Sequence, residues 1–367
     1  MTTSNDDLEI EPAKSPPSLS PDELLPPVEA PNAGFILQLF LVPMMIVTAV
    51  VVVVLLFNWL AHMGTGPEQI IKQLEASSSD RFNPGEWQKA VTLANMLNSP
   101  RYAALKRDAT QAERLARVLL RQLDDGGMDE DQIDLRYFLC QAVGQFQVSE
   151  SIAVLIEAAR LERDAREIKV RRAAIHAVAR LAEHVDVRSL QENKELISTL
   201  GAAATERSSD RLDETRQRAR LRYSAAFALG VIGGRKSLDH LAAMLDDPDP
   251  NARYNAAGGL ARHGDDRGVS VLVEMLEPDN EEAVKFEEEE EESARLRKRG
   301  DVFRNALRAA GELARKNDSA DLTSLAEAVE RLRNADVPAL IRHRVRLDTT
   351  DVLKTLESRV DTAPAVR

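Results

Sequence analysis

Cysteine and aromatic residues are scarce in this sequence, and its 48 basic residues are outnumbered by 60 acidic ones. It has one cysteine, Cys140, an aromatic fraction of 4% and a formal net charge of −12. A single cysteine excludes an intramolecular disulfide. Few aromatics in a chain rich in Ala, Leu, Arg and Glu favour helices packed through small side chains. The acidic balance gives no global field that would attract a polyanion, so nucleic acid is not an expected partner.

Patterns that carry catalysis or metal binding are also missing. The six histidines lie at 62, 176, 184, 240, 263 and 343, without metal-ligand spacing, and His176 and His184 have no accompanying Cys or acidic pattern. Gly233-Gly234 and Gly258-Gly259 complete no phosphate-binding motif, and they indicate instead a repeat turn and a close helix contact. No nucleophile-elbow pattern is present. We therefore expect no catalytic residue, no cofactor-binding residue, no metal ligand and no enzymatic activity.

Charge is absent from one long stretch, which contains the apolar run Phe35–Leu60. No charged residue occurs between Glu29 and Glu68. A helix over the run would be about 39 Å long, against a hydrocarbon core of about 30 Å. Aromatic residues lie near both of its ends, as in membrane-interface belts. The sequence predicts a transmembrane helix over 34–62 that contacts the bilayer through Phe35–Leu60, with a kink at Pro43.

Two alternatives to a transmembrane helix are a cleavable signal peptide and a buried helix of a globular domain. A cleavable signal peptide would have a shorter apolar core and a basic flank, but acidic residues precede this run. A buried helix of a globular domain rarely stays uncharged over this length.

Lys72 and Arg81 follow the run, whereas its N-terminal flank is acidic, so the positive-inside tendency favours a cytoplasmic C-terminal domain. The opposite orientation stays open, because long translocated domains follow loop charge poorly.

The first 33 residues read as a disordered tail. Residues 1–33 contain seven prolines and seven acidic residues against one lysine, Lys14. Such composition cannot bury enough apolar surface to fold. After the apolar run we expect a juxtamembrane linker over 63–83, with one short helix after Pro67. A helical cap or divergent repeat follows over 84–133, with helices near Pro84–Asn98, using Trp87, Val91 and Ala94, and Thr110–Leu123, using Leu115, Val118, Leu119 and Leu123.

An internal repeat becomes clear after Asp134. Ser224–Asp247 aligns with Asn255–Pro278, so that apolar residues of the same kind share columns. The same columns extend to three further copies, and the anchor column of the first helix contains Val143, Val178, Leu229, Leu260 and Leu313. Each copy reads as two helices joined by a tight turn, with small residues beside the anchor and an apolar stripe on the second helix. Neither helix buries its apolar face alone, so the copies should stack.

These columns resemble HEAT repeats, and Leu245–Leu276 resembles most the HEAT-like repeat of the phycobilisome lyase family. The resemblance implies an all-α fold, an α-solenoid of about five to six HEAT-like helix pairs over 134–358. Insertions stretch the repeat near 191–220 and 279–299, and 359–367 should be a disordered C-terminus. An Arg recurs near the start of the first helix, although the fifth copy has Ala in that column; the residues are Arg136, Arg171, Arg222, Arg253 and Ala306.

Three features of the solenoid were weighed as functional sites. Cys140 shares its column with Ala226, Ala257 and Ala310, so we expect a buried structural cysteine. The charged insertion Glu281–Arg299 should be a solvated helix or a loop that binds a partner or a divalent ion. Two basic clusters are alternative phosphate-binding patches; they comprise Arg216, Arg218, Arg220, Arg222 and Arg342, Arg344, Arg346.

Together these observations predict a membrane-tethered, non-catalytic scaffold that binds a protein partner along the helical surface. The alternative is a subunit or relative of a bilin lyase or isomerase, which the resemblance to the lyase repeat implies. Fold does not by itself carry function, so the scaffold is the preferred hypothesis.

Overall fold

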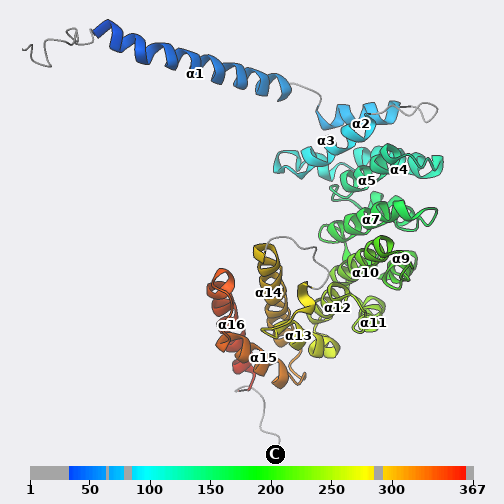
Figure 1. Ribbon diagram of the computed structural model, residues 1–367. Coiled ribbons are helices and arrows are strands. Elements are labelled where there is room, and N and C mark those ends of the chain that lie inside the picture. The colour runs from blue at the N-terminus through cyan, green and yellow to red at the C-terminus, as the bar shows by residue number, and fades with distance from the viewer. Residues whose placement is uncertain (1–32, 63–65, 78–84, 285–291, 361–367) are drawn as a thin grey trace, which may run out of the picture. The chain divides into compact units, whose positions relative to one another are not determined.

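The computed structural model describes residues 33–62, 66–77, 85–284 and 292–360, and it divides the chain into two units, Met1–Gly64 and Thr65–Arg367. The described part of the first unit is one helix, α1 (Ala33–His62), which continues through Pro43 (Figure 1). Its side chains from Phe40 to Leu56 are exposed. Among the described residues, no helix combines the length and apolar character that a membrane crossing needs. The predicted tail lies outside the described residues except for Ala33.

The second unit is entirely helical over its described residues. The sequence therefore predicted the all-α class correctly. Besides short 3-10 turns, the helices are α2 (Pro67–Ala76), α3 (Glu86–Asn98), α4 (Ala109–Asp125), α5 (Glu130–Val143), α6 (Ile152–Ala159), α7 (Ile168–Leu181), α8 (Val187–Glu192), α9 (Lys194–Ala204), α10 (Leu212–Ile232), α11 (Arg235–Ala243), α12 (Pro250–Arg262), α13 (Val269–Leu276), α14 (Glu292–Lys316), α15 (Thr323–Asn334) and α16 (Ala339–Val360).

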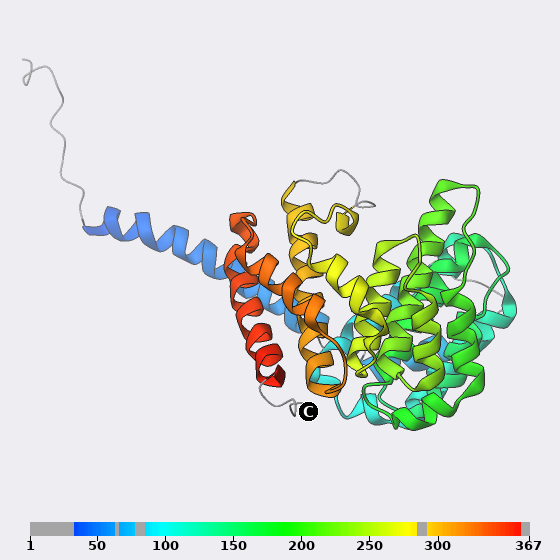
Figure 2. The same cartoon turned by 90° about the horizontal axis from the view of Figure 1, so that it is seen from below.

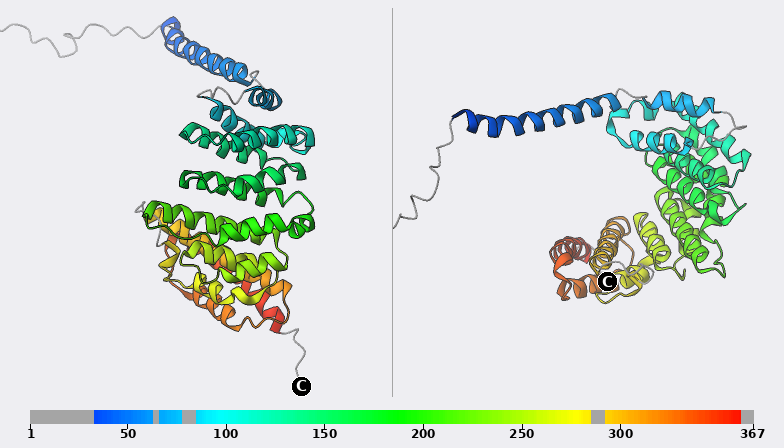
Figure 3. Two further views of the ribbon diagram at one scale, coloured as in Figure 1. Left: turned by 90° about the vertical axis from the view of Figure 1, so that its right-hand side faces the viewer. Right: turned by 45° about the horizontal axis from the view of Figure 1, so that its top comes forward.

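These helices form two layers, as expected of a solenoid. In layer A each helix packs on the next, in the order α3, α5, α7, α10, α12, α14, α16. In layer B, α2, α4, α6, α9 and α11 follow one another in the same way, and α13 packs on α15. Successive rungs are visible in Figure 3, and Figure 2 shows α14, α15 and α16 together at the C-terminal end. The stack changes direction after α12 (Figure 1).

The repeat columns seen in the sequence are the core of this stack. All five residues of the anchor column are at most 1% exposed; they are Val143, Val178, Leu229, Leu260 and Leu313. One column of the second helix is equally buried, at 0%, and comprises Leu155, Leu241, Leu272 and Leu325. Burial of a Leu side chain contributes about 1.5–3 kcal/mol, so these columns supply much of the driving force for stacking.

Three of the four paired glycines have the predicted roles: Gly233 and Gly234 form a repeat turn, and Gly259 makes a close helix contact. Gly233 and Gly234 adopt φ of 65° and 80° in the turn between α10 and α11, a region that favours glycine. Gly259 packs against Gly230 of α10, and a Cβ on Gly259 would lie 2.9 Å from the Gly230 Cα. The neighbouring Gly258 takes no part in this contact, because a Cβ there would meet nothing within 4 Å.

The region before the recognisable repeats is part of the same stack. α2 lies within the segment expected as a linker over 63–83, and it buries Ile70, Ile71 and Leu74 against α3 and α4. α3 and α4 occupy layers A and B, and α4 buries its predicted stripe. On α3 the predicted face was right for Ala94 and wrong for Trp87 and Val91. Its buried stripe is Ala90, Leu93, Ala94 and Leu97, whereas Trp87 and Val91 are only half-buried beside it.

The buried face of α3 differs from the predicted one because α3 packs against both α2 and α5. Its buried stripe is therefore rotated away from the face that contains Trp87. Trp87 instead stacks on Phe138 of α5, with ring centroids 6.2 Å apart. An aromatic ring at the edge of a stripe can bury its body while its polar N–H stays near solvent.

The two insertions lengthen individual pairs. The short α8 carries the buried Leu190, and α9, within the insertion near 191–220, occupies the layer-B position between α6 and α11. The same insertion extends α10 at its N-terminal end. The insertion near 279–299 contains a 3-10 turn at Glu282–Val284 and the start of α14.

The recurrent arginine links consecutive repeats. Each one donates a hydrogen bond to a backbone carbonyl at or just after the end of the preceding layer-B helix, at distances of 2.7–3.3 Å; the pairs are Arg136–Gly127, Arg171–Ala159, Arg222–Glu206 and Arg253–Asp247. The last carbonyls of a helix have no partner within it, so a cation there satisfies an acceptor and complements the helix dipole. In α14, Ala306 occupies this column and is buried.

Candidate functional site

Cys140 and the histidines form no reactive or metal-binding centre in the described residues. Cys140 is fully buried, as the small-residue column predicted, and burial raises the pKa of its thiol to about 12. His176 Nε2 lies 3.0 Å from Ser224 Oγ, and His184 is near Gln147. No group of three or more His, Cys, Asp or Glu side chains that could hold a metal ion occurs in the described part of the chain.

The arginine cluster on α10 splits into two sets. Arg222 is buried and forms a bidentate pair with Asp247, at 2.7 and 3.0 Å, while Arg218 pairs with Glu206. Arg216 and Arg220 are exposed and lie on another side of the helix. In the second predicted cluster, two of the three arginines form ion pairs with nearby acids: Arg342 pairs with Asp336, and Arg344 pairs with Asp348.

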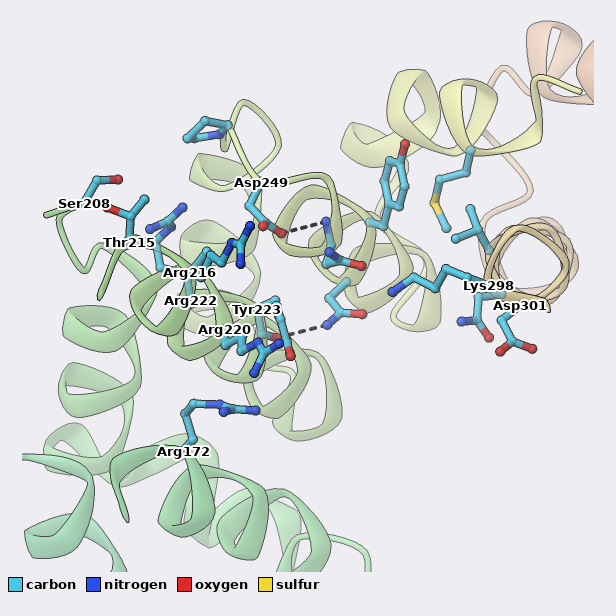
Figure 4. A pocket seen from close by; sticks show the side chains of 18 of the residues that line it. Arg172, Ser208, Thr215, Arg216, Arg220, Arg222, Tyr223, Asp249, Lys298 and Asp301 are labelled. Atoms are coloured by element: carbon cyan, nitrogen blue, oxygen red, sulfur yellow. Dashed lines mark hydrogen bonds between the residues drawn. The ribbon is translucent and has the colours of Figure 1, made fainter. Parts of the chain in front are cut away.

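Arg216 and Arg220 line a groove of about 890 Å³ formed mainly by the layer-A helices α10, α12 and α14. Arg172 of α7 stands at one end of the groove, and Lys298 of α14 extends toward α12 from the other side (Figure 4). Tyr223, Tyr254, Asn255 and other residues of α10 and α12 form the floor. This groove is larger than two other cavities lined by described residues, which have volumes of about 270 and 160 Å³.

A smaller cavity of about 160 Å³ continues the groove along the same helices. It shares Tyr254, Asn255, Met275 and Asn305 with the larger one. Its lining includes Phe227, which is 40% exposed, and the open position beside Gly258. The groove therefore combines a polar, basic end with a small apolar floor.

The groove keeps several cations without an acidic partner. No hydrogen bond or ion pair is recorded among the described residues for the side chains of Arg172, Arg220, Arg262 or Arg308, all of which line the two cavities. The Arg172 Nε is buried and has no hydrogen-bond partner. Opposing charge is limited. Asp249 is buried as the N-cap of α12, and Asp301 pairs with Arg304, which leaves Glu312 as the remaining acid in the lining.

The walls of the groove are held by hydrogen bonds between helices. Asn255 Nδ2 donates to the Tyr223 carbonyl at 3.0 Å, which joins α12 to α10. Tyr254 donates its hydroxyl hydrogen to Glu274 at 2.9 Å and accepts a hydrogen bond from Asn280, also at 2.9 Å. Burial, and to a lesser extent the hydrogen bond donated to Glu274, raise the pKa of Tyr254 against the lowering effect of Asn280, so its hydroxyl stays protonated at neutral pH.

The charged insertion begins on this network. Asn280 is buried, and Glu281 accepts a hydrogen bond from Arg299 of α14 at 2.8 Å and lies 3.6 Å from Arg295. Basic side chains at the start of α14 are thus paired with the acid that precedes it. Residues 285–291, which include most of the predicted acidic run, lie outside the described residues, so the predicted partner or ion contact of this insertion stays a prediction.

Comparison with known families agrees with the repeat columns. A family model of HEAT repeats matches residues 208–290, which include α10 to α13. Residues 208–290 therefore carry HEAT repeats. The sequence matches none of the curated proteins with which it was compared.

Solved structures similar to this HEAT array are distant. One is an engineered protein, with 14% identity and a TM-score of 0.35, over 80% of this chain and 97% of that one. Another is human deoxyhypusine hydroxylase in complex with glycerol, with 16% identity and a TM-score of 0.28, over the same shares of the two chains.

The arginines of α10 are evident in the sequence, but the groove that they line is not. The helical spacing of Arg216 and Arg220 placed them on one side of a helix, which was the available signal. Arg172, Arg262 and Arg308 come from other repeats, and only stacking brings them to the same surface.

Proposed function

We propose that the protein is a non-catalytic, membrane-tethered scaffold whose HEAT array binds another protein along layer A. The observation that carries the proposal is the groove across α10, α12 and α14, which joins several repeats into one surface with unpaired cations and exposed apolar side chains. Stacked helix pairs offer extended surfaces of this kind, and HEAT repeats often serve protein interaction.

The tether is proposed from α1. The uncharged run Phe35–Leu60 lies within a single helix of 30 residues, and its described side chains are exposed. Those side chains run only from Phe40 to Leu56, fewer than the ~20 residues that cross a bilayer. The tether therefore depends on the sequence beyond them. We propose further that the array lies on the cytoplasmic side, because Lys72 and Arg81 follow the run.

The alternative activity, attachment or isomerisation of a bilin, has less support. A buried thiol whose pKa is raised to about 12 is a poor nucleophile at neutral pH, so Cys140 is unsuited to covalent attachment. A purified full-length protein that carries a visible tetrapyrrole absorbance would favour the alternative.

The scaffold is tested by crosslinking in intact cells, followed by detergent extraction and mass spectrometry. We expect one or a few proteins to crosslink repeatedly to residues of α10, α12 and α14. The control is a chain in which layer-B positions carry the crosslinker. Crosslinks that are equally distributed over both layers, or no reproducible partner, would contradict the proposal.

A further inference from the structure

The groove of layer A has a composition that selects one kind of partner. Arg172, Arg220, Arg262 and Arg308 reach it from four helices, and none has a recorded hydrogen bond or ion pair among the described residues. Some exposed arginines elsewhere in the array are paired with acids, as Arg160 is with Glu195 and Arg267 with Asp239. The groove is distinguished by the gathering of four such available cations from four helices around one groove and its continuation.

We propose that the groove binds an acidic, extended peptide segment of the partner protein, an inference that rests on the proposed scaffold function. Carboxylates of the segment would pair with guanidinium groups, which bind planar anions in a bidentate manner. Arg172 supplies a buried Nε–H that has no partner in the array itself, so an incoming carboxylate would satisfy a donor rather than compete for one.

The floor favours a peptide over other anionic chains. Asn251, Asn255 and Asn305 line the groove with amides, which offer both a donor and an acceptor to a peptide backbone. At Gly258 a side chain is missing and a Cβ would meet nothing within 4 Å, which leaves space for a backbone or a small apolar side chain beside Phe227.

Nucleic acid fits the groove less well. Asp301 and Glu312 stand among the cations, and a nucleic acid carries a phosphate at every nucleotide, so some of its charges would meet these acids, whereas a peptide can place uncharged residues beside them. Single-stranded nucleic acid also gains much of its affinity from stacking on several aromatic rings, and the lining provides Tyr223, Tyr254 and Phe227, of which Tyr254 is buried.

The test measures fluorescence anisotropy of labelled probes with the full-length chain in a zwitterionic detergent. The probes are an alternating Glu-Ser peptide, a Gln-Ser peptide of the same length and a single-stranded oligothymidylate. We expect the Glu-Ser peptide to bind and the Gln-Ser peptide not to bind. Binding should weaken between about 0.05 M and about 0.5 M salt, because the Debye length shortens severalfold.

Variants locate the site. The double variant Arg172→Glu with Arg220→Glu breaks no recorded hydrogen bond or ion pair of either side chain, and it should weaken binding about tenfold or more. The matched control, Arg188→Glu with Arg235→Glu, changes the same charge on α8 and α11, outside layer A, and should leave affinity within about twofold. Gly258→Leu fills the floor without changing any charge and should also weaken binding.

Three results would overturn the assignment: no binding of the Glu-Ser peptide, an equal loss in the two charge-reversal variants, or tighter binding of the oligothymidylate in competition with the peptide. Circular dichroism checks that each variant is folded, and Gly258→Leu provides a second test if the charge reversals unfold the chain. A cellular partner whose crosslinks survive the Arg172→Glu and Arg220→Glu changes would reject the groove and leave the scaffold intact. Failure to find any partner would reject the scaffold alone.

Discussion

Arginine has two separate roles in this chain, and they depend on burial. Arg136 is fully buried and lies 2.9 Å from Glu167, which is also fully buried and accepts hydrogen bonds from Arg163. Arg220 belongs to the same residue type but is exposed on the groove. A buried guanidinium is tolerated only when its charge is matched, so the first role is structural, whereas the second leaves charge available for a partner.

Replacing Glu167 with Gln should destabilise the array strongly. The substitution keeps the shape of the side chain but leaves the buried charge of Arg136 unmatched, and breaking a buried pair in this way costs about 3–5 kcal/mol. Urea unfolding followed by circular dichroism measures the change. Asp239→Ala, which removes an exposed partner of Arg267, should cost no more than about 1 kcal/mol. Equal losses in the free energy of unfolding would show that the buried Arg136–Glu167 pair contributes no more to stability than an exposed pair.

His176 should make the array less stable as the pH falls below neutrality. Burial and the nearby Arg172 and Arg180 lower the pKa of His176 from its ordinary value. The unfolded chain therefore binds a proton at a pH where the folded chain does not. The free energy of unfolding consequently decreases as the pH falls from the unfolded pKa, about 6.5, toward the lower folded pKa.

The measurement is urea unfolding at about pH 7.5 and about pH 5.5, a range that lies above the ordinary pKa of Asp and Glu. His176→Gln retains a hydrogen-bonding group near Ser224 but does not titrate, so its stability should fall less on acidification than that of the parent chain. An identical pH dependence in the two proteins would assign the effect to another group.

At the scale of the elements, adjacent glycines of α12 have opposite consequences for packing. Gly259 touches α10 through Gly230, so the two helices approach closely at this point. Gly258 lies one residue earlier on the same helix and faces the smaller cavity. Small residues let neighbouring repeats stack, and the same helix uses a small residue to leave part of the groove open.

Alanine substitutions separate these two roles. Gly259→Ala should destabilise the array by about 1–3 kcal/mol, because its Cβ would lie 2.9 Å from both the Gly230 Cα and Leu241 Cδ1. Gly258→Ala should stabilise it by about 0.5–1 kcal/mol, because alanine is favoured over glycine within a helix and the space is open. Thermal unfolding of the two variants gives the comparison. Stabilisation by Gly259→Ala would mean that α10 and α12 are not in close contact.

At the scale of the whole molecule, the chain separates an uncharged helix from a charged array. Described buried residues all lie between Pro67 and Leu356, in the second unit, whereas the described side chains of α1 from Phe40 to Leu56 are exposed. The described side chains of α1 therefore present apolar surface that is not buried. This exposed apolar surface is the basis of the proposed tether.

Residues 65–367 should accordingly fold without the first unit. We expect the truncated chain to keep helical circular dichroism and to stay in the aqueous phase of a detergent phase separation. The full-length chain should enter the detergent phase because of Phe35–Leu60. A full-length chain that remains aqueous would contradict the tether, and a truncated chain that lacks helical signal would contradict the independence of the array.

The sequence by itself determined the helical class and the stacking register. Periodic apolar columns are a local property of each repeat, and burial of a column such as Leu229 and Leu260 follows whenever identical units stack. The small-residue column also predicted the burial of Cys140. The sequence predicted a short helix after Pro67 but not the packing of α2, and it missed most of the buried stripe of α3, because both depend on helices that contact each from two sides.

Only the tertiary structure decided what the charges do. The recurrent Arg136, Arg171, Arg222 and Arg253 are alike in the sequence, and their shared role is visible only when the end of the preceding layer-B helix lies beside them. The groove likewise joins Arg172, Arg220, Arg262 and Arg308, which are far apart along the chain. Local patterns determine which faces are buried, whereas electrostatic complementarity depends on distances between repeats, and those distances arise from stacking.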